Sequence, residues 1–223
     1  MHTDEVLRHL SSGSVEDQLA VLRGFTPEMA VPEIYSVLLT NLTNSDDSVG
    51  FFCLDALIKQ YPARVHQDAA LLTPLLLRLL TAHDGPVTDR AMWALSVTGP
   101  GSVDALLAYI RQSTDDYQLQ MGIWALGRNA HIRRAPTAIN TLRAYLRHSN
   151  LAVRSVALGV LMDLSPLRPW YAYGEAMEYD FELLYPELLK TARALLAASY
   201  QDQEMSRRYL ELLESHLGPG SAQ

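Results

Sequence analysis

Cysteine and lysine are scarce in this chain of 223 residues, and each scarcity argues against a class of protein. A single cysteine, Cys53, excludes an internal disulfide framework and suits a reducing compartment, so we expect a cytoplasmic protein. Lysine occurs only at Lys59 and Lys190, and the net charge is −7. Because nucleic-acid binding depends on Lys and Arg contacts to phosphate, this balance makes nucleic acid an unfavoured partner. It leaves room for a local basic patch, but an acidic chain favours basic partners.

Long apolar runs and the common catalytic motifs are missing as well. The longest apolar run, around Leu71 to Leu80, is interrupted by Thr73, Pro74 and Arg78 and falls short of the roughly 20 residues that span a bilayer. The first ten residues carry early acids and no apolar signal-peptide region. The histidines show no HxxxH spacing, and neither a Walker A nor a GxGxxG motif occurs. We therefore expect no membrane span, no metal, no cofactor and no catalytic residue.

What the sequence does contain is a twelve-residue pattern that occurs four times without a gap. The copies are residues 46–57, 84–95, 115–126 and 150–161, and their starts lie 31 to 38 positions apart. Each copy begins with Asp or Asn, which is a favourable N-cap, and each ends with Leu. Periods in this range are typical of stacked helical repeats.

The rest of the chain also has helical periodicity. Apolar residues recur at spacings of three and four, and no alternating strand pattern appears. Beside the four copies we expect helices near 3–10, 15–24, 31–43, 68–82, 102–113, 136–148, 183–198 and 202–217. The sequence thus predicts an all-α fold: a right-handed α-solenoid of about six antiparallel helix pairs. We expect one domain over 1–223, with clear repeats over 31–161, an insertion at 164–182 and a C-terminal helix pair over 183–217.

One position of the repeated pattern is always small. It holds Cys53, Ala91, Gly122 and Ala157. At about 100° per residue this position lies on the same side as the Val and Leu residues expected in the core. A small side chain there lets neighbouring helices approach closely.

This pattern resembles HEAT repeats, which are armadillo-like helical repeats. Residues 150–161, Asn-Leu-Ala-Val-Arg-Ser-Val-Ala-Leu-Gly-Val-Leu, carry the likeness best, and Trp124-Ala-Leu-Gly is similar to bacterial lyase-type HEAT-like repeats. The other copies depart from the pattern where its arginine becomes Gly50, Thr88 and Leu119. The resemblance implies an architecture shared by adaptors, inhibitors, chromophore lyases and one class of DNA-repair glycosylase. It does not choose a function among them.

Two tryptophans are the first candidates for a binding site. Trp93 and Trp124 occupy the same position in consecutive copies, more than 120° from the core side. In a HEAT-like stack that side lines the concave surface, where the two rings would form an aromatic ridge. Since Trp is enriched in binding hot spots, we weigh a partner-binding ridge against packing between adjacent repeats. The same side carries three further candidates: Asp55, Asp89 and Gln120.

The second candidate is the segment 170–187, which holds six aromatic and five acidic residues and no Lys or Arg. Aromatic rings beside carboxylates suit a basic protein or a cationic ligand. The alternative is a loop that folds back and covers the edge of the repeats. The candidate contact residues are Trp170, Tyr171, Tyr173, Glu175, Glu178, Tyr179 and Asp180. A basic cluster, Arg128, His131, Arg133 and Arg134, is either a solvated turn, a phosphate site or a partner of this acidic segment.

Two functions from different classes are compatible with these features. The leading one is a non-enzymatic interaction protein that binds a protein partner, favoured as basic by the charge, through its concave face as an adaptor, inhibitor or immunity protein. The alternative is a HEAT-like DNA glycosylase acting on alkylated bases, with Trp93, Trp124 and Asp89 holding the nucleotide. Net charge and the scarcity of lysine argue against it, and a bilin lyase rests on the resemblance alone. Neither the identity of the partner nor the oligomeric state follows from the sequence.

Overall fold

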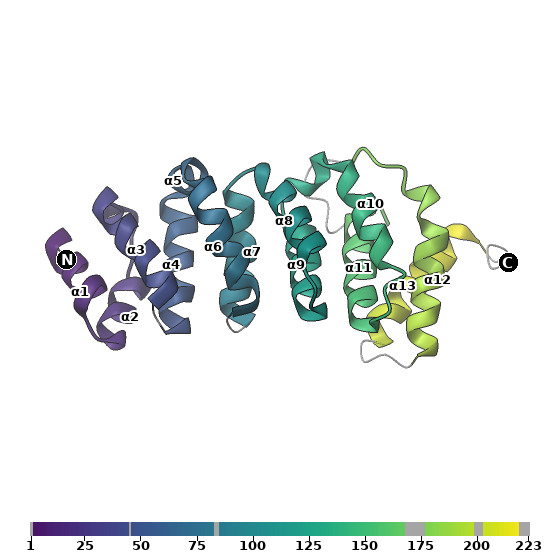
Figure 1. Cartoon of the computed structure of the whole chain (residues 1–223), viewed down its shortest axis with the longest axis horizontal. Helices are drawn as coiled ribbons and strands as arrows, with labels where there is room; N and C mark the ends of the chain where they lie inside the picture. The colour runs from purple at the N-terminus through teal and green to yellow at the C-terminus, as the bar shows by residue number, and fades with distance from the viewer. Residues whose placement is uncertain (1, 45, 83–84, 168–176, 199–202, 219–223) are drawn as a thin grey trace. The chain divides into compact units, whose positions relative to one another are not determined.

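The described part of the chain is built from helices alone. A computed structural model describes residues 2–44, 46–82, 85–167, 177–198 and 203–218, and these contain no β-strand (Figure 1). The all-α prediction is therefore confirmed. The α-helices are α1 (Thr3–Ser12), α2 (Val15–Arg23), α3 (Pro32–Asn44), α4 (Asp47–Gln60), α5 (Pro62–Gln67), α6 (Ala69–Ala82), α7 (Gly85–Val97), α8 (Gly101–Gln112), α9 (Asp116–Arg128), α10 (Pro136–Tyr145), α11 (Leu151–Leu164), α12 (Tyr185–Ala197) and α13 (Gln203–Leu217). Short 3-10 helices are η1 (Pro27–Met29), η2 (Ile132–Arg134) and η4 (Phe181–Leu183).

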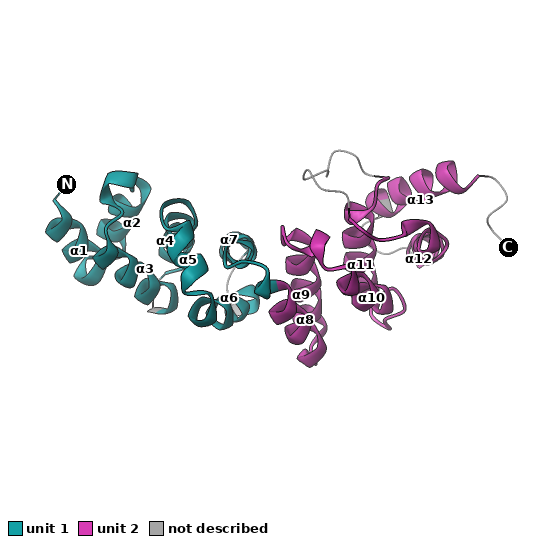
Figure 2. Ribbon diagram, turned by 90° about the horizontal axis from the view of Figure 1, so that it is seen from above, with its two compact units in different colours: residues 1–102 teal, residues 103–223 magenta. Residues whose placement is uncertain are grey.

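The chain divides into two compact units, Met1–Ser102 and Val103–Gln223 (Figure 2). In unit 1, α2, α4 and α7 pack side by side in one row, while α1, α3, α5 and α6 lie on the other side of that row. The space between the two layers is filled by apolar side chains, whose removal from water is the main stabilising contribution. The fully buried ones include Leu10, Ile34, Leu38, Leu54, Leu72, Leu76, Leu80, Met92 and Leu95.

In unit 2, α11 is the central helix, with α9, α10 and α12 packed against it. The C-terminal helix α13 packs along α12. The approach of α9 to α11 is close, because a Cβ atom added at Gly127 would lie 2.5 Å from a methyl carbon of Val160. A residue larger than glycine at position 127 would therefore not fit between α9 and α11 without moving Val160.

Three of the four copies of the repeated pattern show the predicted N-cap, and Asp84, which begins the second copy, lies outside the described residues. Asp46, Asp115 and Asn150 are helix N-caps whose side chains accept backbone N–H groups of the first turn, at 2.9 Å for Asp46 and Ser48. The small position is buried in all four copies, as predicted. A Cβ atom at Gly122 would lie 2.9 Å from a side-chain carbon of Ile110 on α8, so this side chain occupies the space that a larger residue would need.

One helix was not predicted. The described residues contain thirteen α-helices, where the sequence indicated about twelve, and the additional one is α5. Pro62 begins it, and Tyr61 before it has φ −126° and ψ 36°, outside the helical region, as proline disfavours a helical residue at that position. Six residues are too few to show helical periodicity. The Tyr61 hydroxyl donates to the Val31 carbonyl at 2.9 Å, which fixes the start of α5.

Across the described ranges, no helix combines the length and the apolar character that crossing a bilayer requires.

Candidate functional site

Both predicted tryptophans are partly exposed. Trp93 on α7 retains 46% of its surface and Trp124 on α9 retains 40%. A tryptophan packed between repeats would lose nearly all of its surface, so that alternative does not describe either side chain. The two residues belong to different units, and the surface around each is described separately.

In unit 1, the Arg90 side chain lies between the Trp93 ring of α7 and the Phe51 ring of the neighbouring helix α4. The guanidinium carbon of Arg90 lies 5.1 Å from the centre of the Trp93 ring and 4.9 Å from that of Phe51 on α4. Both distances are within the range of cation–π attraction. Arg90 therefore contacts the Trp93 ring of its own helix α7 and the Phe51 ring of the neighbouring helix α4.

The contacts continue across α4 to α2. Phe51 meets Phe52 edge to face, with ring centres 5.1 Å apart, and the guanidinium of Arg23 lies 5.7 Å from the Phe52 ring. We call this set the aromatic–arginine row: Arg23, Phe52, Phe51, Arg90 and Trp93. It runs over three helices that pack side by side, so regular backbone holds every member in place.

Asp55, a predicted site residue, lies beside the row and is engaged by two cations. One carboxylate oxygen is 2.7 Å from the Lys59 ammonium, and the other is 3.2 Å from Nε of Arg90. The contact between Asp55 and Arg90 is an ion pair rather than a hydrogen bond. Oδ1 of Asp55 and Nε of Arg90 are both buried, and neither has a hydrogen-bond partner. Asp55 therefore positions Arg90 and Lys59 rather than offering an unpaired acid to a ligand. Asp89 has an exposed side chain one residue before Arg90.

In unit 2, Trp124 is also covered by an arginine. The guanidinium of Arg128, one turn further along α9, lies 4.6 Å from its ring centre. The predicted Gln120 donates its amide to the Asp116 carbonyl of the same helix at 3.1 Å. Tyr117, at 48% exposure, is a further accessible aromatic residue of α9 that the sequence analysis did not single out.

The fourth copy has glycine where the tryptophans occur, and there the position is covered. The hydroxyl of Tyr209 on α13 lies 3.6 Å from the place that a Cβ atom of Gly159 would take. Tyr209 itself is only 5% exposed. In the fourth copy, the face of α11 that corresponds to the tryptophan position is therefore covered by α13.

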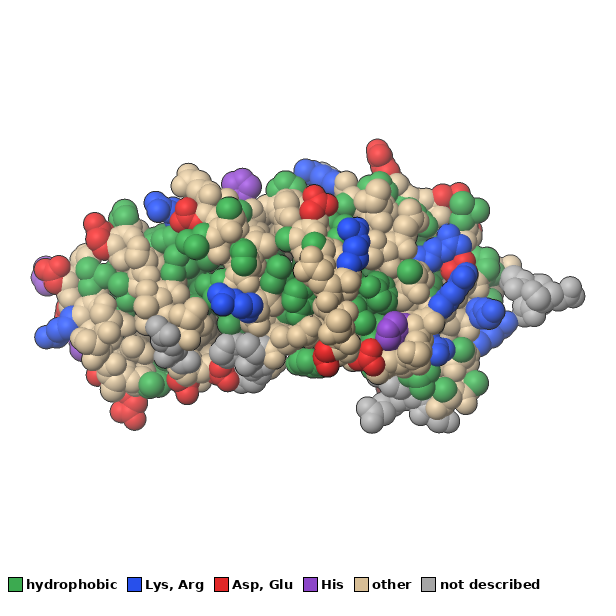
Figure 3. Space-filling model, viewed as in Figure 1, with side chains coloured by type: hydrophobic (Ala, Val, Ile, Leu, Met, Phe, Trp, Pro, Cys, Tyr) green, Lys and Arg blue, Asp and Glu red, His purple; other side chains and the backbone are tan. Residues whose placement is uncertain are grey.

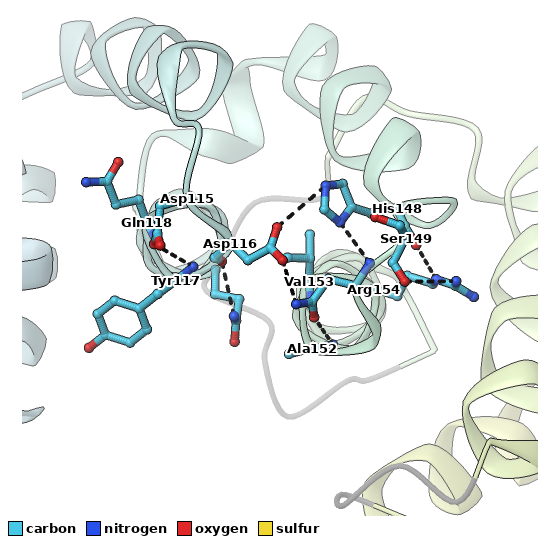
Figure 4. A network of polar contacts seen from close by, with 11 residues as sticks. Asp115, Asp116, Tyr117, Gln118, His148, Ser149, Ala152, Val153 and Arg154 are labelled. Atoms are coloured by element: carbon cyan, nitrogen blue, oxygen red, sulfur yellow. Dashed lines mark hydrogen bonds and ion pairs between the residues drawn. The ribbon is translucent and has the colours of Figure 1, made fainter.

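A polar network joins the starts of α9 and α11 (Figure 4). The Asn150 amide donates to Asp116 at 2.6 Å, and its backbone N–H donates to Nδ1 of His148 at 3.2 Å. Nε2 of His148 is 3.9 Å from Asp116, and Arg154 donates to the carbonyls of His148 and Ser149. A histidine beside a carboxylate is a common catalytic pair, but here both groups are bonded to the turn that begins α11. We therefore assign the network a structural role.

Part of the acidic segment is described, and its aromatic residues pack inward. Phe181 and Tyr185 are buried, and Tyr179 meets Phe181 edge to face at 5.2 Å. Tyr185 in turn meets the ring of His216 on α13 at 4.9 Å. From residue 177 onward the segment thus follows the alternative prediction, a chain that covers the edge of the last helices. Trp170, Tyr171, Tyr173 and Glu175 lie outside the described residues.

Two acids of this segment have basic partners from other helices. Both oxygens of Glu182 contact Nε2 of His216, at 2.9 and 3.0 Å. Glu187 receives two hydrogen bonds from Arg143 and one from Arg147, which lower the pKa of its carboxyl group. Figure 3 shows several Lys and Arg side chains on the surface in the region of α12.

The other two described acids of the segment are exposed. They are Glu178 and Asp180, and Asp180 accepts the backbone N–H of Glu182 at 3.1 Å. Fewer acids of this segment are therefore available to a basic partner than the sequence count of five suggests.

Chemical sites are sparse in the described ranges. No group of three His, Cys, Asp or Glu side chains has an arrangement that holds a metal ion. Cys53 is fully buried, and burial raises the pKa of its thiol to about 12. It is therefore not a reactive nucleophile.

Comparisons with known proteins leave the family open. No protein-family model matches the chain. No curated protein matches it either. Among solved structures, the crystal structure of an engineered protein, a structural-genomics target, aligns over 96% of this chain and 98% of its own. The identity is 19% and the TM-score is 0.46.

Proposed function

We propose that this chain is a non-enzymatic helical-repeat protein that binds another protein through the aromatic–arginine row. The observation that carries the proposal is that Trp93 is half exposed and that Arg90 connects its ring to the neighbouring helix α4. Tryptophan and arginine are enriched in binding hot spots, and such residues act best when they are already ordered. Trp124 with Arg128 offers a second contact point of the same kind on unit 2. Such a surface is compatible with an adaptor, an inhibitor or an immunity protein.

We further infer that the repeats form a right-handed HEAT-like solenoid of about six helix pairs, working in the cytoplasm. The gapless alignment of four copies supports the repeat, since the same N-cap and the same small position recur in both units. The single buried cysteine is consistent with a reducing compartment.

The glycosylase alternative is less well supported. In each tryptophan a guanidinium already covers one ring face, where an alkylated base would have to stack. Alkylated bases are frequently cationic, and a neighbouring arginine repels them.

Quantitative affinity capture tests the proposal. The parent chain, Trp93→Ala and Trp124→Ala would each be used to recover proteins from a native lysate of the source cells. Leu71→Ala is the matched control, because Leu71 on α6 is 66% exposed and lies outside the row. We expect a partner that the parent and the control recover and that Trp93→Ala loses by at least tenfold. Recovery of the same proteins in equal amounts by all four chains would contradict the proposal.

A further inference from the structure

The row carries an excess of positive charge inside an acidic chain. Three cations belong to it or contact Asp55 beside it: Arg23, Lys59 and Arg90. Two carboxylates accompany them, Asp55 and Asp89. The three cations exceed these two carboxylates by one, whereas the whole chain has a net charge of −7. Charge complementarity at this place therefore favours an acidic partner, in contrast to the basic partner favoured by the whole chain.

The way in which Arg90 is held leaves it suited to a carboxylate. The guanidinium carbon of Arg90 lies 4.9 Å from the Phe51 ring centre and 5.1 Å from the Trp93 ring centre, and carboxylates bind a guanidinium through the N–H groups in its plane. Asp55 is within 3.2 Å of Nε but does not align as a hydrogen-bond acceptor. The guanidinium thus has hydrogen-bonding capacity that the described chain does not use. Its side chain keeps 22% exposure, and Lys59 beside it keeps 51%.

We propose that the aromatic–arginine row takes an acidic segment of the partner protein, in which a carboxylate pairs with Arg90 and Lys59 while an adjacent aromatic or aliphatic side chain rests on Trp93. The inference rests on the proposed function, because it names the chemistry of the partner at the same surface. It also gives a role to Arg23, Lys59 and Arg90, the three cations that lie in the row or pair with Asp55 beside it.

Nuclear magnetic resonance of the full chain tests this directly, because the three tryptophans give three indole N–H signals that single substitutions assign. The probes are a pentapeptide of four glutamates around one phenylalanine, its lysine counterpart and a short oligothymidylate. We expect the Trp93 signal to move saturably with the glutamate peptide and to stay in place with the other two. Arg90→Gln and Lys59→Gln should each weaken the affinity for the glutamate peptide at least tenfold. Lys190→Gln, which changes an exposed residue of α12, should leave this affinity unchanged.

Each other outcome overturns the inference in a recognisable way. A response to the lysine peptide would reverse the assigned charge and leave the row as a protein-binding surface. A response to the oligothymidylate alone would assign the row to nucleic acid and remove the proposed function with it. A glutamate response that survives Arg90→Gln and Lys59→Gln would place the acidic site elsewhere. No response to any probe, combined with capture that depends on Trp93, would refute the acidic segment alone.

Discussion

The guanidinium of Arg90 lies 5.1 Å from the ring of Trp93, three residues further along α7, and 4.9 Å from the Phe51 ring on α4. The Arg90 side chain therefore connects the exposed Trp93 ring of α7 to α4. This relationship makes Trp93 an ordered surface residue, and the proposed binding depends on that order.

Trp93→Ala should destabilise the fold by about 1–2 kcal/mol, because half of the ring surface is already in water and an exposed cation–π contact contributes about 0.5–1 kcal/mol. A fully buried tryptophan would cost about 3–5 kcal/mol. Urea denaturation of parent and variant measures the difference. A loss in the higher range would mean that Trp93 is a core residue.

The same change, glycine to alanine, should have opposite effects at two helical positions. At Gly127 the new Cβ would lie 2.5 Å from Val160, and we expect a loss of about 1–3 kcal/mol. At Gly50 the new Cβ has nothing within 4 Å, and alanine should stabilise α4 by about 0.5–1 kcal/mol. Thermal melts compare the two variants. Equal shifts would refute the close approach of α9 to α11.

The small position should not tolerate a large residue in either unit. Ala91→Leu and Gly122→Leu each place a branched side chain where the helices are in contact, at an expected cost of about 1–3 kcal/mol. Leu71→Met, at an exposed site of α6, is the control and should leave the melting temperature unchanged. An unaltered melting temperature for both leucine variants would contradict the register of the repeat.

Cys53 should resist alkylation in the folded chain. It is fully buried, and burial raises its thiol pKa to about 12, so little reactive thiolate exists at pH 8. Iodoacetamide should modify the native chain at least a hundredfold more slowly than the chain in guanidinium chloride. Mass spectrometry of timed samples measures both rates, and similar rates would show that Cys53 is accessible.

Glu187 should contribute to stability at neutral pH and lose that contribution in acid. Hydrogen bonds from Arg143, together with the charges of Arg143 and Arg147, lower its pKa below the ordinary value of 4.5. The stabilisation is therefore complete above pH 4.5 and disappears as the pH falls through the lowered value. We expect Glu187→Gln to cost about 1 kcal/mol at pH 7 and progressively less below pH 4.5.

Glu204→Gln is the matched control for that experiment. Glu204 pairs with Arg208 on α13 but is 75% exposed, so its removal should change stability little at any pH. Urea denaturation between pH 3 and pH 7 compares both variants with the parent. A Glu187→Gln difference that is constant with pH would exclude the ion pair as its cause.

The sequence predicts the local features of this fold well, because they depend on residues close together in the chain. Helical spacing, the capping Asp46, Asp115 and Asn150, and the buried small positions all follow from patterns within one turn or one repeat. The helix α5 was missed because a single turn and a half has no measurable period. The exposure of Trp93 and Trp124 followed from their angle around the helix, although sequence alone did not choose between exposure and packing.

The contacts of the candidate site were harder to predict, since they join separate helices. Arg90 precedes Trp93 by three residues, and this spacing was readable, but its contact with Phe51 depends on the rotamers of side chains 39 positions apart. Glu187 and Arg143 are 44 positions apart, so the charge count of the acidic segment gave no sign of its basic partners. The pairing of Asp55 with Arg90 was missed for the same reason.

The restraint of Arg90 has a thermodynamic consequence. A long, flexible side chain that becomes fixed only when a partner arrives loses conformational entropy, at about 0.5–1.5 kcal/mol for each side chain. Arg90 has already lost this freedom during folding, because Phe51, Trp93 and Asp55 hold it from three sides. Association at this surface therefore begins from a rotamer that is already selected. A lysine at the same position, which lacks a planar group to stack, would have to be ordered anew in every binding event.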